Sequence, residues 1–174
     1  GDRDIFTRFK ELFQDACVKG LGEPYIAWRI ANQAELRVKY GRTVFMQEPN
    51  VKNGTGSLRD YQSLLWISQF KYGITTTAKL VEAKILRDAE RRNLEKSYDF
   101  LLRTRAEMQY INGRSAEVLT LQLQGKVAQA FEYPQKNILR KVEAFMREYY
   151  GHARTIYLVT ESALRKMEAI PPPA

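Results

Sequence analysis

Residues 138–166 read ILRKVEAFMREYYGHARTIYLVTESALRK, and this stretch decides the fold. Apolar side chains and one histidine recur along it at alternating steps of four and three residues, which places them on one face of an α-helix. At 1.5 Å per residue, about 30 residues form a rod of about 45 Å, which is longer than a small domain is wide. We therefore expect a helical bundle whose last helix runs the length of the molecule, with a bend or a close helix crossing at Gly151. The recurring positions are Ile138, Val142, Phe145, Tyr149, His152, Ile156, Val159 and Ala163.

The segments before this helix are long, because the chain has only 10 Gly and 6 Pro and three of the prolines lie at 171–173. Their apolar spacing predicts further helices. The first carries Ile5, Phe6, Phe9, Leu12, Phe13 and Ala16 on one face and ends at Gly20 and Gly22. A second, over 23–40, carries Ile26, Ile30 and Ala34 at four-residue steps. A third helix covers 58–70, and a fourth follows the Thr75–Thr77 cluster and ends at about residue 85. A fifth covers 88–112, and a short helix covers 123–131.

Residues 41–57 break the helical pattern. Gly41, Pro49, Gly54 and Gly56 interrupt them, while residues 43–46 are short, β-branched and aromatic. This pattern predicts one short strand followed by a loop. The fold class is therefore all-α, a bundle of about six to seven helices with a long C-terminal helix and one short strand or loop near residues 43–57.

Composition narrows the class of protein. The chain has 174 residues, a formal net charge of +8 and a sequence pI of about 9.6, so an anionic partner is plausible without being specified. Cys17 and His152 are the only residues of their kinds, which excludes an internal disulfide and a four-ligand Cys/His zinc site. The longest apolar run, 64–67, is far shorter than the ~20 residues of a membrane helix. We expect a cytoplasmic protein that does not enter membranes.

The most informative loop is KNGTGSLRD, residues 52–60. It combines Lys52, Gly54, Gly56 and Arg59 with the start of a helix, and free amides at such a turn favour a phosphate or a carboxylate. The spacing matches neither the P-loop nor the dinucleotide fingerprint. On the residues alone, two interpretations stay open. The loop either binds the phosphate of a nucleotide, or it is a tight turn before a capped helix in which Arg59 and Asp60 pair with neighbouring elements.

Three other features are weaker candidates for a site. Asp2 and Asp4 resemble a magnesium pair, but they precede an amphipathic helix, where acidic residues complement the helix dipole. His152 lies on the apolar stripe and is expected to be a partly buried, hydrogen-bonded histidine. The helix over 88–112 mixes cations and aromatic rings as a nucleic-acid groove does, but carboxylates are interleaved with them, which favours a solvated face. Its residues are Arg87, Arg91, Arg92, Arg103 and Arg105 with Tyr98 and Tyr110, interleaved with Glu90, Glu95, Asp99 and Glu107.

Residues 48–67, EPNVKNGTGSLRDYQSLLWI, resemble the E-P-N-x-K-x-G-x-G-G-L-R-D-x-Q-x-x-x-W segment of bacterial protein-PII uridylyltransferases. The similarity continues through 100–105, 113–114, 119–124 and 145–154, and it covers about residues 1 to 165. In that family this region follows the catalytic nucleotidyltransferase fold and forms a helical domain packed against it. The family usually has Pro and Gly where Thr55 and Ser57 stand here.

The resemblance implies a part of an enzyme. It implies that residues 1–57 end a nucleotidyltransferase module, that 58–170 form the helical bundle and that 171–174 are a linker or tail. The family's metal-binding carboxylates lie upstream, so no catalytic or metal-binding residue and no cofactor is expected in this chain, and Mg²⁺ and a nucleoside triphosphate are expected only for the full-length enzyme. The implied partners are the upstream domain and a PII-like regulatory protein. The alternative is a basic helical module that binds a nucleic acid or an acidic protein. The candidate phosphate-binding residues are Lys52, Gly54, Gly56, Arg59 and Asp60.

Overall fold

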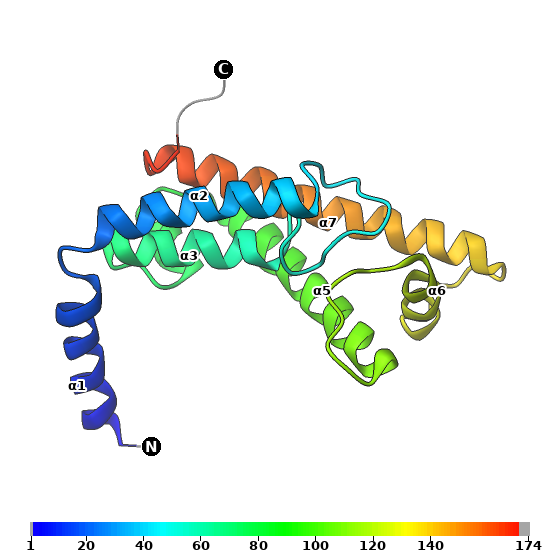
Figure 1. Cartoon of the computed structure of the whole chain (residues 1–174), viewed down its shortest axis with the longest axis horizontal. Helices are drawn as coiled ribbons and strands as arrows, with labels where there is room; N and C mark the ends of the chain where they lie inside the picture. The colour runs from blue at the N-terminus through cyan, green and yellow to red at the C-terminus, as the bar shows by residue number, and fades with distance from the viewer. Residues whose placement is uncertain (1, 171–174) are drawn as a thin grey trace.

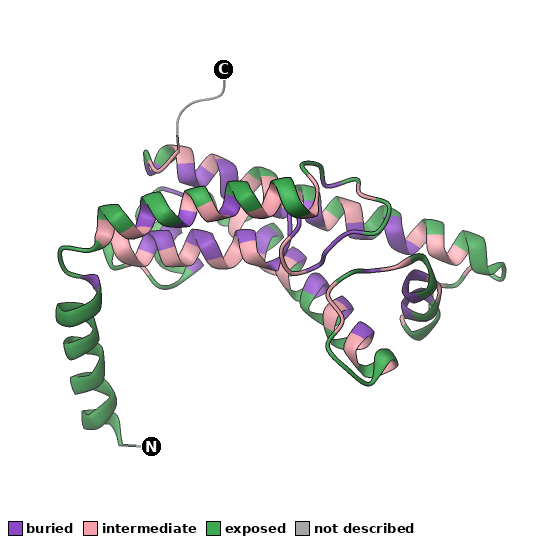
Figure 2. Ribbon diagram, viewed as in Figure 1, coloured by how far each residue is buried: buried purple, intermediate pink, exposed green. Residues whose placement is uncertain are grey.

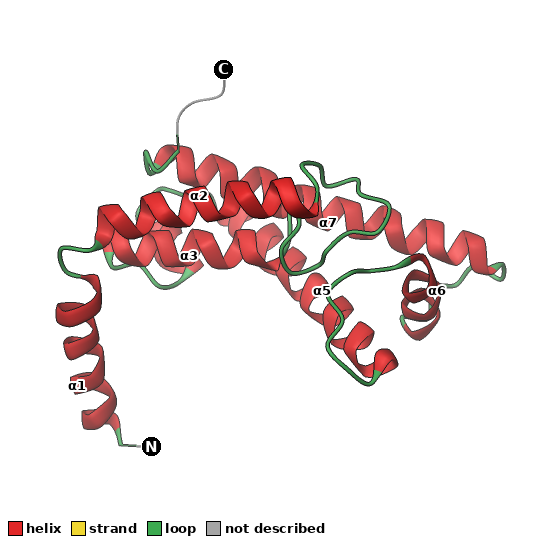
Figure 3. Ribbon diagram, viewed as in Figure 1, coloured by secondary structure: helices red, strands yellow, loops and turns green. Residues whose placement is uncertain are grey.

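A computed structural model describes residues 2–170, and every named element within them is a helix (Figure 3). The all-α bundle with a long last helix is thus confirmed. The predicted linker or tail at 171–174 lies outside the described residues, and the proposed division of the chain at residue 57 stays a prediction. In chain order the elements are α1 (Arg3–Phe13), a π-helical turn (Gln14–Val18), α2 (Gly22–Tyr40), α3 (Leu58–Tyr72), α4 (Thr77–Glu82), α5 (Asp88–Asn112), α6 (Leu121–Ala130) and α7 (Ile138–Lys166).

Side-chain caps and left-handed glycines set most of these boundaries. Asp2 caps α1 by accepting the N–H groups of two residues in the first turn, which gives this carboxylate a structural role. Ser57 and Asn137 begin α3 and α7 in the same way. Gly113 ends α5 at φ +64°, a conformation that glycine adopts without strain. Local capping chemistry therefore explains why the boundaries of α5 match the prediction.

The core is built around α3 and α7. Helix α7 packs against α5, α6 and α3, and α3 in turn packs against α2 and α5 (Figure 1). The predicted seam of α7 faces inward, since Phe145, Ile156 and Ala163 have no exposed surface and Tyr149 is 2% exposed (Figure 2). Burying such side chains supplies the main free energy of folding. The three-and-four spacing of the last helix thus identified the centre of the bundle.

Helix α1 projects away from the bundle and has no buried residue (Figures 1 and 2). Its apolar side chains are mostly exposed, from 41% for Phe13 to 68% for Ile5. A hydrogen bond from Gln69 to Gln14 joins the following turn to α3. The amphipathic pattern therefore predicted a helix correctly, but the apolar face of this helix does not pack against the bundle.

Three expectations need correction. Residues 43–46 form turns, because the Thr43 hydroxyl accepts the N–H of Phe45 and no strand pairs with this segment within 2–170. An isolated bridge joins Asn50 to Val118 nearby. The predicted apolar row of α2 is only partly buried, since Ile26 lies in the core and Ile30 packs against it, but Ala34 is exposed. At Gly151 an added Cβ would meet no atom within 4 Å, which excludes a close helix crossing there.

Candidate functional site

The loop before α3 uses its backbone amides internally. The side-chain oxygen of Asn50 accepts hydrogen bonds from the N–H groups of residues 52 and 53. The backbone carbonyl oxygen of Asn50 accepts the N–H of Gly54 at 2.9 Å. The N–H of Leu58 donates to Val51, and that of Arg59 donates to the Lys52 carbonyl at 2.9 Å. These amides are therefore not free to receive a phosphate, and any contact with an anion falls to the side chains of the loop.

The two loop glycines are buried and allow close approach of the chain to itself. A Cβ on Gly56, which has φ +72°, would lie 2.2 Å from the carbonyl oxygen of Ala153 on α7. A Cβ on Gly54 would lie 2.8 Å from the Asn50 carbonyl oxygen. Since the space above each glycine is filled by backbone, these residues position the loop against α7 and against its own first turn.

Lys52 and Arg59 are the cations that the loop presents at the surface, and both are partly exposed. Lys52 Nζ lies 3.8 Å from a carboxylate oxygen of Glu117. The Arg59 guanidinium lies 5.6 Å from the ring centre of Trp66, and Arg29 lies 4.4 Å from the same ring. Two guanidinium groups thus stack on one indole, an arrangement in which the positive charges are stabilised by the ring electrons.

The same face of the bundle carries further aromatic rings. Trp28 is 58% exposed and lies 5.9 Å from the Arg29 guanidinium. Tyr25 stacks on Phe70 of α3 with ring centres 3.8 Å apart. We call Tyr25, Trp28, Arg29, Arg59 and Trp66 the arginine–tryptophan face. Trp28 is exposed and Arg59 is partly exposed on this face, whereas Arg29 is buried, and tryptophan and arginine are the residue types enriched at binding hot spots.

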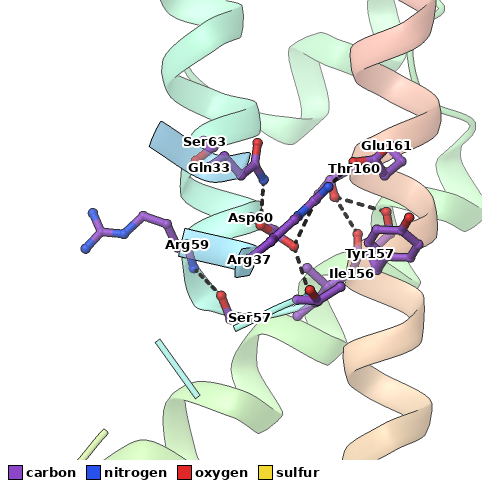
Figure 4. A network of polar contacts seen from close by, with 12 residues as sticks. Gln33, Arg37, Ser57, Arg59, Asp60, Ser63, Ile156, Tyr157, Thr160 and Glu161 are labelled. Atoms are coloured by element: carbon purple, nitrogen blue, oxygen red, sulfur yellow. Dashed lines mark hydrogen bonds and ion pairs between the residues drawn. The ribbon is translucent and has the colours of Figure 1, made fainter. Parts of the chain in front are cut away.

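Asp60 belongs to a different environment from Arg59, although the two are neighbours in sequence. Its carboxylate is 2% exposed and accepts hydrogen bonds from the Gln33 side chain at 2.5 Å and from the Gly56 amide at 2.8 Å. The Arg37 guanidinium lies 3.5 Å from this carboxylate and also donates a hydrogen bond to the Glu161 carboxylate at 2.8 Å. Figure 4 shows that Arg59 points away from this network. The hypothesis that Asp60 orients Arg59 is therefore wrong, and Asp60 instead ties the loop to α2.

Burial and charge act in opposite directions on this network. Burial raises the pKa of the Asp60 carboxyl, while Arg37, Gln33 and the Gly56 amide lower it. For Arg37, burial lowers the pKa, but the Asp60 and Glu161 carboxylates raise it by more, so the net pKa shift is upward. Burial also lowers the pKa of Arg29, which has an N–H group with no hydrogen-bond partner among the described residues.

The remaining candidates have structural partners. His152 receives or donates a hydrogen bond at 3.0 Å with Ser97, as expected for a partly buried histidine. The α5 arginines pair with carboxylates, including Arg105 with Glu117 at 2.6 Å, so their charge is largely compensated. In residues 2–170, no group of three or more His, Cys, Asp or Glu side chains is placed to hold a metal ion, and no helix is long and apolar enough to cross a membrane.

Sequence analysis missed Arg29, Gln33 and Arg37, the polar side chains of α2 that contact Trp66 and Asp60 of α3. These residues recur at four-residue steps and so share one face of the helix. Arg29 and Gln33 are buried beside Ile26 of the predicted apolar row, so polar and apolar side chains share the buried face of this helix. Buried long polar side chains need partners, so a polar row of this spacing was a signal for a network.

Comparison with known proteins identifies the relatives of this chain. A bifunctional uridylyltransferase/uridylyl-removing enzyme of Bradyrhizobium sp. (strain BTAi1) is 32% identical over 168 residues, which are 97% of this chain and 18% of that protein. The protein of the same name from Rhodospirillum rubrum is 32% identical over 156 residues, which cover 90% of this chain and 17% of its own length. The chain therefore spans less than a fifth of these curated relatives. No solved structure matches it.

A match to a family model agrees with these pairwise similarities. The sequence model described as GlnD PII-uridylyltransferase matches residues 25–164, from α2 to nearly the end of α7. This range contains the loop, the arginine–tryptophan face and the Asp60 network. Since the match covers most of its length, the chain belongs to the GlnD PII-uridylyltransferase family.

Proposed function

We propose that this chain is the helical region of a uridylyltransferase-like nucleotidyltransferase. In this proposal it packs against a catalytic nucleotidyltransferase fold and places Lys52 and Arg59 beside the nucleotide phosphates or at the interface between the two parts. Gly54, Gly56 and Asp60 hold the loop that carries these cations. The nucleoside triphosphate and Mg²⁺ bind to the catalytic fold, and a PII-like regulatory protein in the cytoplasm is the acceptor.

The observation that carries the proposal is the stack of Arg29 and Arg59 on Trp66. Three of the rings and cations on this face come from α2 and two come from α3, so the packing of the two helices creates the surface. Arg59 hydrogen-bonds to Asn53 at 3.4 Å, a long contact, and forms no ion pair within residues 2–170. Its N–H donors are thus available to an anion, which arginine binds through paired hydrogen bonds.

A chimera tests this function. Residues 25–164 would replace the matching region of the Rhodospirillum rubrum relative, and transfer of uridylyl groups from UTP to a PII protein would be measured. We expect the chimera to be active. We expect Arg59→Ala to lower kcat/KM by about 10- to 100-fold, because a hydrogen bond to a charged group contributes about 1.5–3 kcal/mol.

Arg92→Ala is the matched control, since it removes the same charge from an exposed position on α5. Circular dichroism melts of the free chain report whether either change affects folding. The proposal fails if Arg59→Ala leaves both kcat/KM and stability unchanged, or if Arg92→Ala lowers kcat/KM as much as Arg59→Ala does.

A further inference from the structure

A cavity of about 540 Å³ lies between α2 and α7, and Gln33, Arg37 and Glu161 of the Asp60 network form part of its lining. Both helices pack against α3, and the ion pair between Arg37 and Glu161 joins them across the cavity. Pockets of a few hundred cubic ångströms are the usual size for small-molecule sites. The cavity is therefore large enough for a small organic ligand.

Positive charge dominates the polar part of this cavity. Arg37, Arg42 and Arg165 line it, and Arg37 and Arg165 share the single carboxylate of Glu161. With Asp60 beneath them, three positive charges meet two negative charges, which leaves a surplus of one. Arg42 is exposed and forms no ion pair with any residue from 2 to 170. An anion would balance this surplus.

The guanidinium groups also have more donors than the protein supplies with acceptors. Nε of Arg37 and Nε of Arg165 have no hydrogen-bond partner among the described residues, and Nη2 of Arg37 has only its 3.5 Å ion-pair contact with Asp60. Buried donors without acceptors are costly. These N–H groups are enclosed, so an anion reaches them when the side chains turn toward the cavity, whereas Arg42 already stands at its rim.

Another part of the cavity wall is apolar. Ile30, Ala34 and Val38 come from α2, and Ile170 closes the cavity beyond the end of α7. A ligand that fits both walls carries an anionic group at one end and an apolar body at the other. A carboxylate has two oxygens, which one guanidinium group can satisfy, whereas a phosphate monoester has three terminal oxygens to share among three arginines.

We propose that this cavity is a second ligand site, which binds a small phosphate monoester with its phosphate on Arg37, Arg42 and Arg165 and its apolar body against Ile30 and Val38. The site is independent of the proposed role of Arg59. It lies between α2 and α7, while the arginine–tryptophan face belongs to α2 and α3.

Phenyl phosphate is the probe, with inorganic phosphate and benzoate as comparisons that lack the apolar body and the phosphate, respectively. Each would be titrated into the 174-residue chain by calorimetry, and amide NMR shifts would locate the binding. We expect phenyl phosphate to bind at least tenfold more tightly than either comparison, with the largest shifts at Ala34 and Val38. We expect Arg42→Gln or Arg165→Gln to weaken binding about tenfold, because each removes a charge-assisted contact.

Arg92→Gln on α5 is the control for loss of charge, and it should leave the affinity unchanged. Arg42 serves as the main test because it holds no other side chain, whereas Arg165 pairs with Glu161. The proposal is overturned if no phenyl phosphate binds at 10 mM, if benzoate binds as tightly, or if Arg92→Gln weakens binding equally. It is also overturned if the shifts fall on residues 52–59 instead. That last result would leave the proposed role of the loop standing, so the two proposals fail separately.

Discussion

Replacing Gly56 by alanine tests whether this glycine serves the packing of the loop on α7. The substitution acts in two ways that the structure separates. At φ +72° a residue with a Cβ is strained, which costs about 1–2 kcal/mol. The new Cβ would also lie 2.2 Å from the Ala153 carbonyl oxygen and 3.1 Å from a methyl group of Val44, so the loop and α7 must separate. Overpacking of this kind typically costs about 1–3 kcal/mol. We expect the free energy of unfolding to fall by about 2–5 kcal/mol.

Two other glycines of the chain serve as controls. Gly113 has φ +64° and no atom within 4 Å of an added Cβ, so Gly113→Ala measures the backbone cost alone. Gly151 lies inside α7 and is equally open, so Gly151→Ala should raise stability by about 0.5–1 kcal/mol.

Urea unfolding followed by circular dichroism gives the free energy for each variant. If Gly56→Ala loses no more stability than Gly113→Ala, the clash with α7 does not exist and Gly56 is available to a ligand after all.

Two further predictions concern the polar network and the lone histidine. Asp60→Ala should lower the free energy of unfolding by about 3–5 kcal/mol, because it leaves Arg37 and the Gly56 amide without their partner. Asp60→Asn should lose less stability. A loss under 1 kcal/mol for Asp60→Ala in urea unfolding would contradict the network. Burial lowers the pKa of His152 below 6.5, although Glu148 partly opposes this shift. The unfolded chain therefore binds more protons below pH 6.5, and stability should decline as the pH falls from 6.5 through the native pKa, a decline that His152→Gln removes. An NMR titration of the imidazole that gives a pKa of 6.5 or more would refute this.

The elements that the sequence predicted well are those whose signals are local. Helix α5 begins and ends where predicted because Gly113 adopts the left-handed conformation that stops a helix, and α7 has an apolar period that matches a packed seam. The predicted strand at 43–46 failed for the opposite reason. Strand-forming side chains give a strand only when a neighbouring strand supplies hydrogen bonds, and the Thr43 hydroxyl closes a turn instead.

The geometry of the site depended on contacts that sequence spacing does not show. Asp60 follows Arg59 directly, and adjacent residues on a helix point in different directions, so the pair was not placed to interact. The real partner of Asp60 is Gln33, which is 27 residues away on another helix. Predicting this contact required knowing which face of α2 meets α3. The apolar row indicated this face through buried Ile26, but it did not show that the polar side chains of Arg29 and Gln33 are buried beside it.

Arg59 and Asp60 lie in different environments, and this difference determines how functional data on the loop should be interpreted. A variant of Asp60 breaks contacts that join α3, the loop and α2, so loss of uridylyl transfer in that variant would report an altered fold. Arg59 makes one long hydrogen bond and one stacking contact at a partly exposed position, so its removal leaves the core intact. Of the five loop residues first singled out, only Lys52 and Arg59 can therefore link a change in activity to phosphate binding. Lys52 is the weaker probe, because it also faces Glu117, which already binds Arg105.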